Sequence, residues 1–271
     1  MSLALRRIAL TVEYDGTNLC GWQRQDNGPT VQGHIETVLS QILNGPIRVW
    51  GASRTDSGVH ARGQVCHFDT TRPISVEGIV RGLNSLLPTT IAIANGRETN
   101  ADFHARFSSR GKDYRYLIWN RPQRAPRLAT RVWHIRRPLE LGPMMSAANR
   151  LVGEHDFSAF RATGCSAKTA NRAIYGIAIG GRSGGLIAID VRGNAFLRNM
   201  VRIVVGTLAD VGTGRLTTEN ISAILESKDR TQAGQTAPAA GLSLIRVHYT
   251  EPKRTAPPTI TNHDEQLDRL M

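Results

Sequence analysis

Hydrophobic residues occupy every second position from Ile8 to Tyr14, which predicts a half-buried strand that ends at Asp15-Gly16. Hydrophobic residues then recur at helical spacing over residues 31–42, and Asn44-Gly45-Pro46 ends that helix. The pattern continues with strands at 47–50 and 64–68, a helix that Ser75 caps and Pro88 stops, and a strand at 91–93. The predicted order is β-α-β-β-α-β, the ferredoxin-like pattern.

The second half of the chain repeats this plan without repeating the residues. A strand is predicted at 112–119, and Pro143 opens a helix with Met144, Ala148, Leu151 and Val152 on its hydrophobic face. The remaining elements are a hairpin of strands 173–179 and 186–191 across residues 180–185, a helix with its hydrophobic face over 196–208, a shorter helix at 219–226 and a strand at 242–249. The sequence therefore predicts an α+β protein.

These patterns divide the chain into three parts. We expect a first half at residues 1–104, a second half at 105–250, and a disordered tail at 251–271, which is rich in proline and poor in hydrophobic residues. A length of 271 residues fits about two domains.

Composition indicates an ordinary globular protein of a reducing compartment. No hydrophobic run approaches the ~20 residues of a membrane helix. Arginines interrupt the first hydrophobic residues, and a strand pattern follows at once, so we expect no signal peptide. Cys20, Cys66 and Cys165 are odd in number and widely spaced, which excludes a disulfide scaffold and a CxxC zinc site. We expect a cytoplasmic protein that does not enter the membrane.

Charge changes this picture. Lys and Arg number 34 against 22 Asp and Glu, a net charge of +12, and only four of the basic residues are lysine. Residues 104–137 hold ten basic residues and one acid, interleaved with tyrosine, tryptophan and phenylalanine. Arginine binds phosphate and stacks on rings, so the pattern favours a nucleic-acid partner. The alternatives are a solvated basic face and a genome that favours arginine codons.

The sequence lacks the residues that several common nucleotide-binding and metal-binding motifs require. Gly16 and Gly21 have P-loop spacing, but Trp22 and Gln23 replace the lysine and hydroxyl residue that hold phosphate and magnesium. His60, Cys66, His67 and His104 lack zinc-ligand spacing, and the PCxxC of nucleobase deaminases is absent. We therefore expect a reaction without metal or cofactor.

The stretch 51–64 joins two predicted strands and is denser in polar groups than a hairpin requires. Asp56 and Gly58 alone would fit a turn, in which Asp56 caps the backbone and Gly58 supplies a positive φ. The wider string 53–61, SRTDSGVHA, resembles the GRTDxGVHA signature of the tRNA pseudouridine synthase A family. Further resemblances to that family follow in its order at 14–16 (YDG), 21–25 (GWQRQ), 103–107 (FHARF), 114–116 (YRY), 194–197 (NAFL), 200–202 (MVR), 204–206 (VVG) and 239–242 (AAGL).

The resemblance assigns roles to four residues. Asp56 is implied as the nucleophile that forms a covalent adduct, and Arg202 as the cation that pairs with it and favours its charged form. Tyr114 is implied to stack on the target uracil, and Arg54 to fill the gap left by the flipped nucleotide. From the residues alone, a core position is slightly favoured for Tyr114, Arg54 could be an exposed loop residue, and Arg202 could lie on a helix surface.

The resemblance also implies the wider function. It implies two ferredoxin-like halves whose mainly antiparallel sheets join, with the active cleft between them, and a homodimer that converts uridines 38, 39 and 40 of the tRNA anticodon arm to pseudouridine. A non-catalytic RNA-binding protein and a synthase acting on another RNA are the competing hypotheses. We expect part of the phosphate-binding surface from five arginines: Arg106, Arg110, Arg121, Arg124 and Arg127.

Overall fold

The computed structural model describes residues 4–181 and 184–257, and the chain divides into two compact units. Residues up to Arg110 and the segment Ser243–Glu251 form the first unit, and Gly111–Leu242 with the segment from Pro252 form the second. Sequence patterns placed the division at residues 104 and 105. Residues 258–271 of the predicted tail, and residues 182 and 183 of the predicted hairpin turn, lie outside the described residues.

The first unit has the predicted order of elements. They are β1 (Arg6–Tyr14), α1 (Val31–Ile42), β2 (Trp50–Gly51), β3 (His60–Thr70), α2 (Val76–Leu86) and β4 (Ile91–Thr99), followed much later in the chain by β10 (Leu242–His248). Strand β1 lies between β4 and β3 and is antiparallel to both. The far edge of β3 pairs with β2 near Cys66 and in parallel with β10 near His60. This is the ferredoxin-like arrangement with one added strand.

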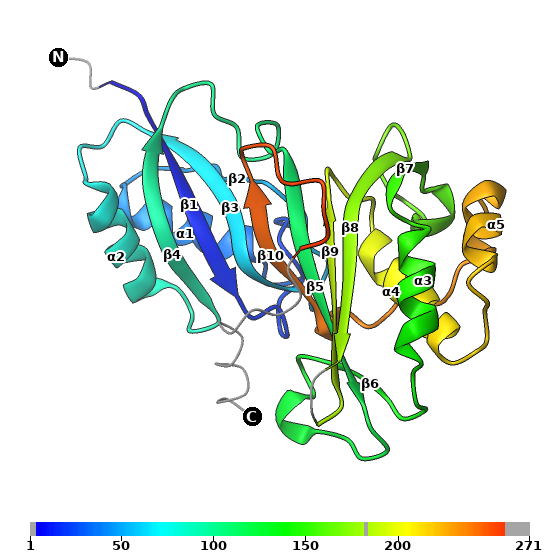
Figure 1. The fold of residues 1–271 in the computed structure, drawn as a ribbon. Helices are drawn as coiled ribbons and strands as arrows, with labels where there is room; N and C mark the ends of the chain where they lie inside the picture. The colour runs from blue at the N-terminus through cyan, green and yellow to red at the C-terminus, as the bar shows by residue number, and fades with distance from the viewer. Residues whose placement is uncertain (1–3, 182–183, 258–271) are drawn as a thin grey trace. The chain divides into compact units, whose positions relative to one another are not determined.

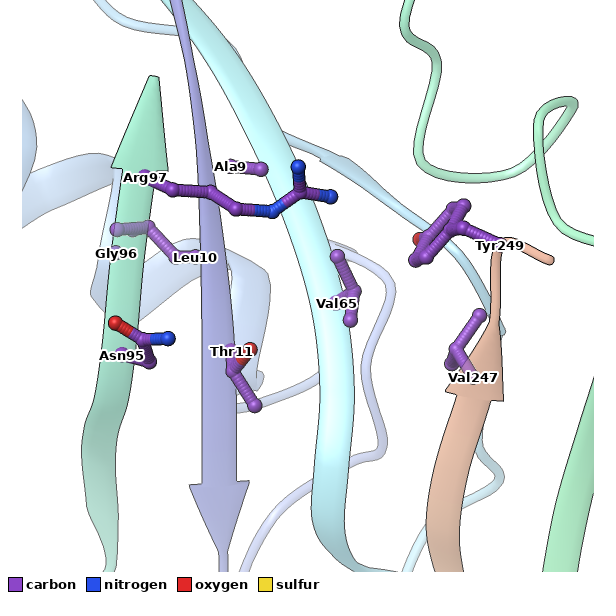
Figure 2. Close-up of a pocket in the computed structure, with 9 residues that line it drawn as sticks. All are labelled: Ala9, Leu10, Thr11, Val65, Asn95, Gly96, Arg97, Val247 and Tyr249. Carbon is purple, nitrogen blue, oxygen red and sulfur yellow. The ribbon is translucent and has the colours of Figure 1, made fainter. Parts of the chain in front are cut away.

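Helices α1 and α2 pack against one face of this sheet, as Figure 1 shows. Alternation along β1 sends Ile8, Leu10 and Val12 toward them, and all three are fully buried. Thr30 and Ser75 begin the helices, because each side chain accepts a hydrogen bond from a backbone N–H three residues later. On this unit, a shallow pocket of about 180 Å³ is lined by Ala9, Leu10, Thr11, Val65, Asn95, Gly96, Arg97, Val247 and Tyr249 (Figure 2).

The second unit is also α+β. Its strands are β5 (Gly111–Asn120), β6 (Trp133–Ile135), β7 (Gly153–Asp156), β8 (Asn171–Gly181) and β9 (Leu186–Gly193), and its α-helices are α3 (Leu141–Asn149), α4 (Met200–Gly212) and α5 (Asn220–Ser227). Strands β5, β9, β8 and β7 lie in that order and are antiparallel, while β6 pairs in parallel with β5. Helix α3 packs against α4 and β8. Both units thus confirm the predicted fold class.

Three details differ from the sequence patterns. Strands β6 and β7 were not predicted. Helix α3 ends at Asn149, so Val152, predicted on its inner face, is 37% exposed. Helix α4 begins only at Met200, which leaves Phe196 in the preceding loop, where its ring contacts Tyr114 edge-on.

The end of the described chain packs on the second unit. The backbone of Ala256 lies so close to Gly176 of β8 that a Cβ atom added to this glycine would overlap it. The Arg254 guanidinium lies over the Tyr175 ring. No helix among residues 4–181 and 184–257 has the length and hydrophobicity to cross a membrane.

Candidate active site

Asp56 lies half-buried in the loop between β2 and β3 of the first unit. Its carbonyl oxygen accepts a hydrogen bond from the Val59 N–H at 3.2 Å, which closes a turn, and Gly58 within that turn has a φ of 78°. The turn therefore has the geometry that the Asp-Ser-Gly tripeptide favours. This alone does not distinguish a nucleophile from a turn residue, because both need the same backbone.

A second segment, residues 15–22, braces the Asp56 loop. The Trp22 N–H donates to the Thr55 carbonyl at 3.1 Å, and the Leu19 carbonyl accepts from the Gly58 N–H at 3.3 Å and from the Ser57 hydroxyl at 3.2 Å. The residues on both sides of Asp56 are thus tied to one neighbouring stretch. The two motifs at 14–25 and 53–61, far apart in the chain, form one structure.

Glycine is required where this brace meets the loop. Gly21 has a φ of 86°, and a side-chain carbon there would lie 2.5 Å from the Thr55 carbonyl oxygen and 3.0 Å from the Asp56 carbonyl carbon. A side-chain carbon at Gly16 would overlap the Val59 carbonyl. Close approach of two backbones explains both glycines of the motif.

Buried side chains complete the support. Gln64, which is fully buried, donates to the Ser53 carbonyl at 2.7 Å and accepts from the Ser53 N–H at 3.2 Å. The Tyr14 hydroxyl lies 2.8 Å from the Thr55 hydroxyl. A glutamine that satisfies both backbone groups of one residue fixes the entry to the loop. Between these supports, Arg54 is exposed and Asp56 is half-buried.

In the second unit, the structure distinguishes Tyr114 from Tyr116, which share one face of β5. Tyr116 is fully buried, and its hydroxyl donates to the Pro238 carbonyl at 2.7 Å. Burial raises the pKa of this hydroxyl well above its usual value, so Tyr116 stays protonated. Tyr114 is 6% exposed, with its ring edge-on to Phe196 at 5.2 Å. Both tyrosines are buried, and they differ in their contacts: the Tyr116 hydroxyl is tied to Pro238, whereas the Tyr114 ring packs against Phe196.

Arg202 is the one residue of α4 that is not buried. Its Nε donates to the Ala237 carbonyl at 2.7 Å, and one terminal nitrogen donates to the Asn199 side chain at 3.1 Å. The Ala237 N–H in turn donates to the Arg202 carbonyl at 3.1 Å. A half-buried guanidinium with fixed hydrogen bonds is a positioned cation, unlike a mobile arginine on a helix surface.

The other side of β5 carries charged pairs that sequence patterns did not single out. Arg192 binds Asp113 through two hydrogen bonds of 2.8 Å, and Arg115 binds Asp190 through bonds of 2.8 and 3.2 Å. Hydrogen bonding to Asp113 raises the pKa of Arg192. These residues lie opposite each other in the β5–β9 register, so only the pairing of the strands could have revealed them.

The five predicted phosphate-binding arginines are all exposed. Arg106 and Arg110 belong to the first unit, where the Arg106 guanidinium lies over the Phe107 ring and Arg110 lies 4.0 Å from Glu251. The other three lie on the loop between β5 and β6, and the Arg121 guanidinium lies over the Trp119 ring.

No group of three potential metal ligands occurs among residues 4–181 and 184–257. His60 is buried and accepts a hydrogen bond from the Gly16 N–H, and His67 accepts one from the Ala105 N–H. The pocket in Figure 2 contains none of the predicted site residues.

Comparison with known proteins adds a separate line of evidence. A family model described as tRNA pseudouridine synthase matches residues 10–108 and 147–250. The chain is 47% identical to tRNA pseudouridine synthase A of Ruminiclostridium cellulolyticum over 245 residues, which cover 90% of this chain and all of that protein. The proteins of the same name from Pseudoalteromonas atlantica and Myxococcus xanthus are 49% and 45% identical, over 90% and 94% of this chain and 93% and 95% of their own lengths.

Proposed function

Because this chain belongs to the tRNA pseudouridine synthase family, we propose that it isomerises uridines 38, 39 and 40 of the tRNA anticodon stem-loop, with Asp56 as nucleophile. Its class as an isomerase acting on tRNA follows from the family. The choice of nucleophile and of the three positions goes further and is the proposal.

The proposed reaction balances without a cofactor. The bond between uracil N1 and ribose C1′ breaks, the base rotates, and a bond forms between C5 and C1′. The proton on C5 is lost and N1 gains one, so the product is an isomer of the substrate. Asp56 contributes a carboxylate oxygen that forms a covalent adduct and is expelled when the new bond is complete.

The braced Asp56 loop is the observation that carries this proposal. Hydrogen bonds fix the residues on both sides of Asp56, and Gly21 allows two backbones to approach at this point. A turn that merely connects β2 to β3 needs no second segment to hold it. A nucleophile does, because displacement of about 1 Å costs orders of magnitude in rate.

Three further residues complete the proposed site. We assign Arg202 to pair with Asp56 and keep it ionised, which its fixed guanidinium supports. Tyr114 is assigned to stack on the uracil, and the structural role of Tyr116, whose hydroxyl donates to the Pro238 carbonyl, supports this choice between the two. Arg54, exposed beside Asp56, is assigned to the gap that the flipped nucleotide leaves.

We also propose a cytoplasmic homodimer. Sedimentation at micromolar concentration should give about 59 kDa, twice the chain mass of 29.7 kDa. An active species that sediments only as the single chain would contradict the dimer and leave the reaction untouched.

A map of pseudouridine in RNA from cells that lack this protein tests the function directly. We expect pseudouridine to disappear at tRNA positions 38, 39 and 40, and to return when the gene is restored. Loss from another RNA instead would assign the enzyme to that RNA. An unchanged map would favour a non-catalytic RNA-binding protein.

A further inference from the structure

A groove of about 450 Å³ lies in the second unit, apart from the residues assigned above. Its lining combines arginines with one tryptophan, and consists of Trp133, His134, Ile135, Arg136, Arg137, Ala209, Thr213, Arg215 and Gln235. Residues 133–137 lie between the two ranges that the family model matches.

One wall of the groove is held rigidly by Asn120. The Asn120 amide donates to the carbonyls of Ile135 and Arg137 at 2.9 and 2.8 Å, and its oxygen accepts from the Leu139 N–H at 3.1 Å. In addition, β6 pairs with β5, and His134 lies 2.8 Å from the Arg121 carbonyl. One side chain thus fixes the backbone that carries Arg136 and Arg137.

Gln235, another lining residue, belongs to a segment that leads to Arg202. The Gln235 backbone packs closely on α4 at Gly206, and a Cβ atom added to this glycine would overlap the Gln235 carbonyl. Two and three residues later, the Ala237 and Pro238 carbonyls accept from Arg202 and Tyr116. The segment that bounds the groove therefore also positions the guanidinium assigned to Asp56.

Charge decides which ligand fits. Arg136, Arg137 and Arg215 are exposed, and no carboxylate among residues 4–181 and 184–257 lines the groove. Asp210, which forms an ion pair with Arg215, is not part of the lining, and 12% of its side chain is exposed. Three guanidinium groups around an open groove complement a chain of phosphates, and the half-buried Trp133 offers an aromatic surface.

We propose that this groove binds the phosphodiester backbone of the substrate RNA, through Arg136, Arg137 and Arg215, as a subsite separate from the reacting base. The inference rests on the proposed function, since it takes the same RNA as the ligand. The subsite should contribute affinity and register while the Asp56 loop performs the chemistry.

The test compares two triple variants of equal charge. Arg136→Gln/Arg137→Gln/Arg215→Gln removes the groove cations, and Arg48→Gln/Arg81→Gln/Arg150→Gln removes three exposed arginines elsewhere. Binding of unmodified tRNA is measured from 50 to 200 mM salt. We expect the groove variant to lower the slope of log affinity against log salt by about 2 to 3, and to weaken binding at least tenfold at 100 mM. The groove variant should therefore raise KM for tRNA.

The double variant Arg136→Gln/Arg137→Gln controls for a loss of stability in the triple variant, because it keeps the Arg215–Asp210 ion pair. It should lower the slope by about 2. Groove variants that match the control triple in slope and affinity would overturn the subsite. If the wild type itself neither binds tRNA nor forms pseudouridine, the proposed function fails instead, so the two failures are distinguishable.

Discussion

Two loops carry residues assigned to RNA, and they are built in opposite ways. Residues 52–59 of the first unit are tied to residues 15–22 and to Gln64 by backbone and side-chain hydrogen bonds. Residues 121–132 of the second unit form a longer loop with a single turn of 3₁₀ helix at Pro126–Leu128, and their arginines are exposed. Chemistry needs atoms at fixed positions, whereas attraction of phosphate needs only charge in the right region.

Asp56→Asn should give the largest difference between the functions of the two loops, which are catalysis and RNA binding. Asparagine keeps the shape and the turn but lacks the nucleophilic oxygen, so pseudouridine formation should fall by about ten-thousandfold or more. The dissociation constant for tRNA should stay within about twofold, because the arginines are untouched. Single-turnover assays and binding measurements check both. Asp102→Asn, at an exposed aspartate of the same unit, is the matched control. Substantial pseudouridine from Asp56→Asn would show that Asp56 only caps a turn.

Tyr114→Phe asks whether the second unit contributes to chemistry as well as to binding. Phenylalanine keeps the ring, so tRNA affinity should persist, while loss of the hydroxyl should lower kcat about a hundredfold if it assists proton transfer. Tyr114→Leu should in addition lose stacking worth about 1–3 kcal/mol. Tyr116→Phe removes the bond to Pro238 and should mainly reduce stability, by about 1 kcal/mol. A larger effect on kcat from Tyr116→Phe would reverse the assignment.

Charge reversal in the exposed loop should change affinity alone. Neutralisation of about six phosphates predicts that wild-type affinity falls roughly a thousandfold from 50 to 200 mM salt. Arg121→Glu/Arg124→Glu/Arg127→Glu should weaken binding about tenfold or more, and the same uridines should react. Affinity that does not change with salt would contradict the claim that the exposed loop binds RNA through its charge.

Gly21→Ala should disturb the backbone of the braced loop while the Asp56 side chain is kept. The added carbon meets the Thr55 carbonyl at 2.5 Å, so we expect kcat to fall about tenfold and stability to fall by about 1–3 kcal/mol. Gly214→Ala is the control, because Gly214 has a similar φ of 73° but its added carbon meets no heavy atom of the described residues within 4 Å. Equal effects on kcat from the two variants would mean that the brace does not position the loop.

The fold could be predicted where patterns are long. Nine residues of β1 and twelve of α1 show clear periodicity, and the first six elements appeared in the predicted order. Strands β6 and β7, of three and four residues, are shorter than a window in which alternation can be recognised. Helix α4 is buried on every side except at Arg202, so its pattern could not define where it begins.

The sequence could predict which residues belong to the site, but it could not predict the contacts that hold them in place. The string around Asp56 indicated the loop, whereas its brace depends on hydrogen bonds between residues more than thirty positions apart, such as Trp22 to Thr55. Local patterns carry no information on such pairs. Tyr114 and Tyr116 were equivalent by alternation, so at the level of the sequence only the family motif separated them, and their contacts with Phe196 and Pro238 came from the structure.

The late position of β10 has a consequence for synthesis of the chain. Ser243 and Leu244 pair with His60 and Ala61, directly after the Asp56 loop, although Arg110 ends the earlier part of the first unit. At roughly 5–20 residues per second, a ribosome needs about 10 s to make the residues between. During that interval the newly made first unit exposes an unpaired strand edge beside the Asp56 loop, a surface open to mispairing with other chains. The nascent protein therefore completes the sheet beside the Asp56 loop only after β10 has been translated.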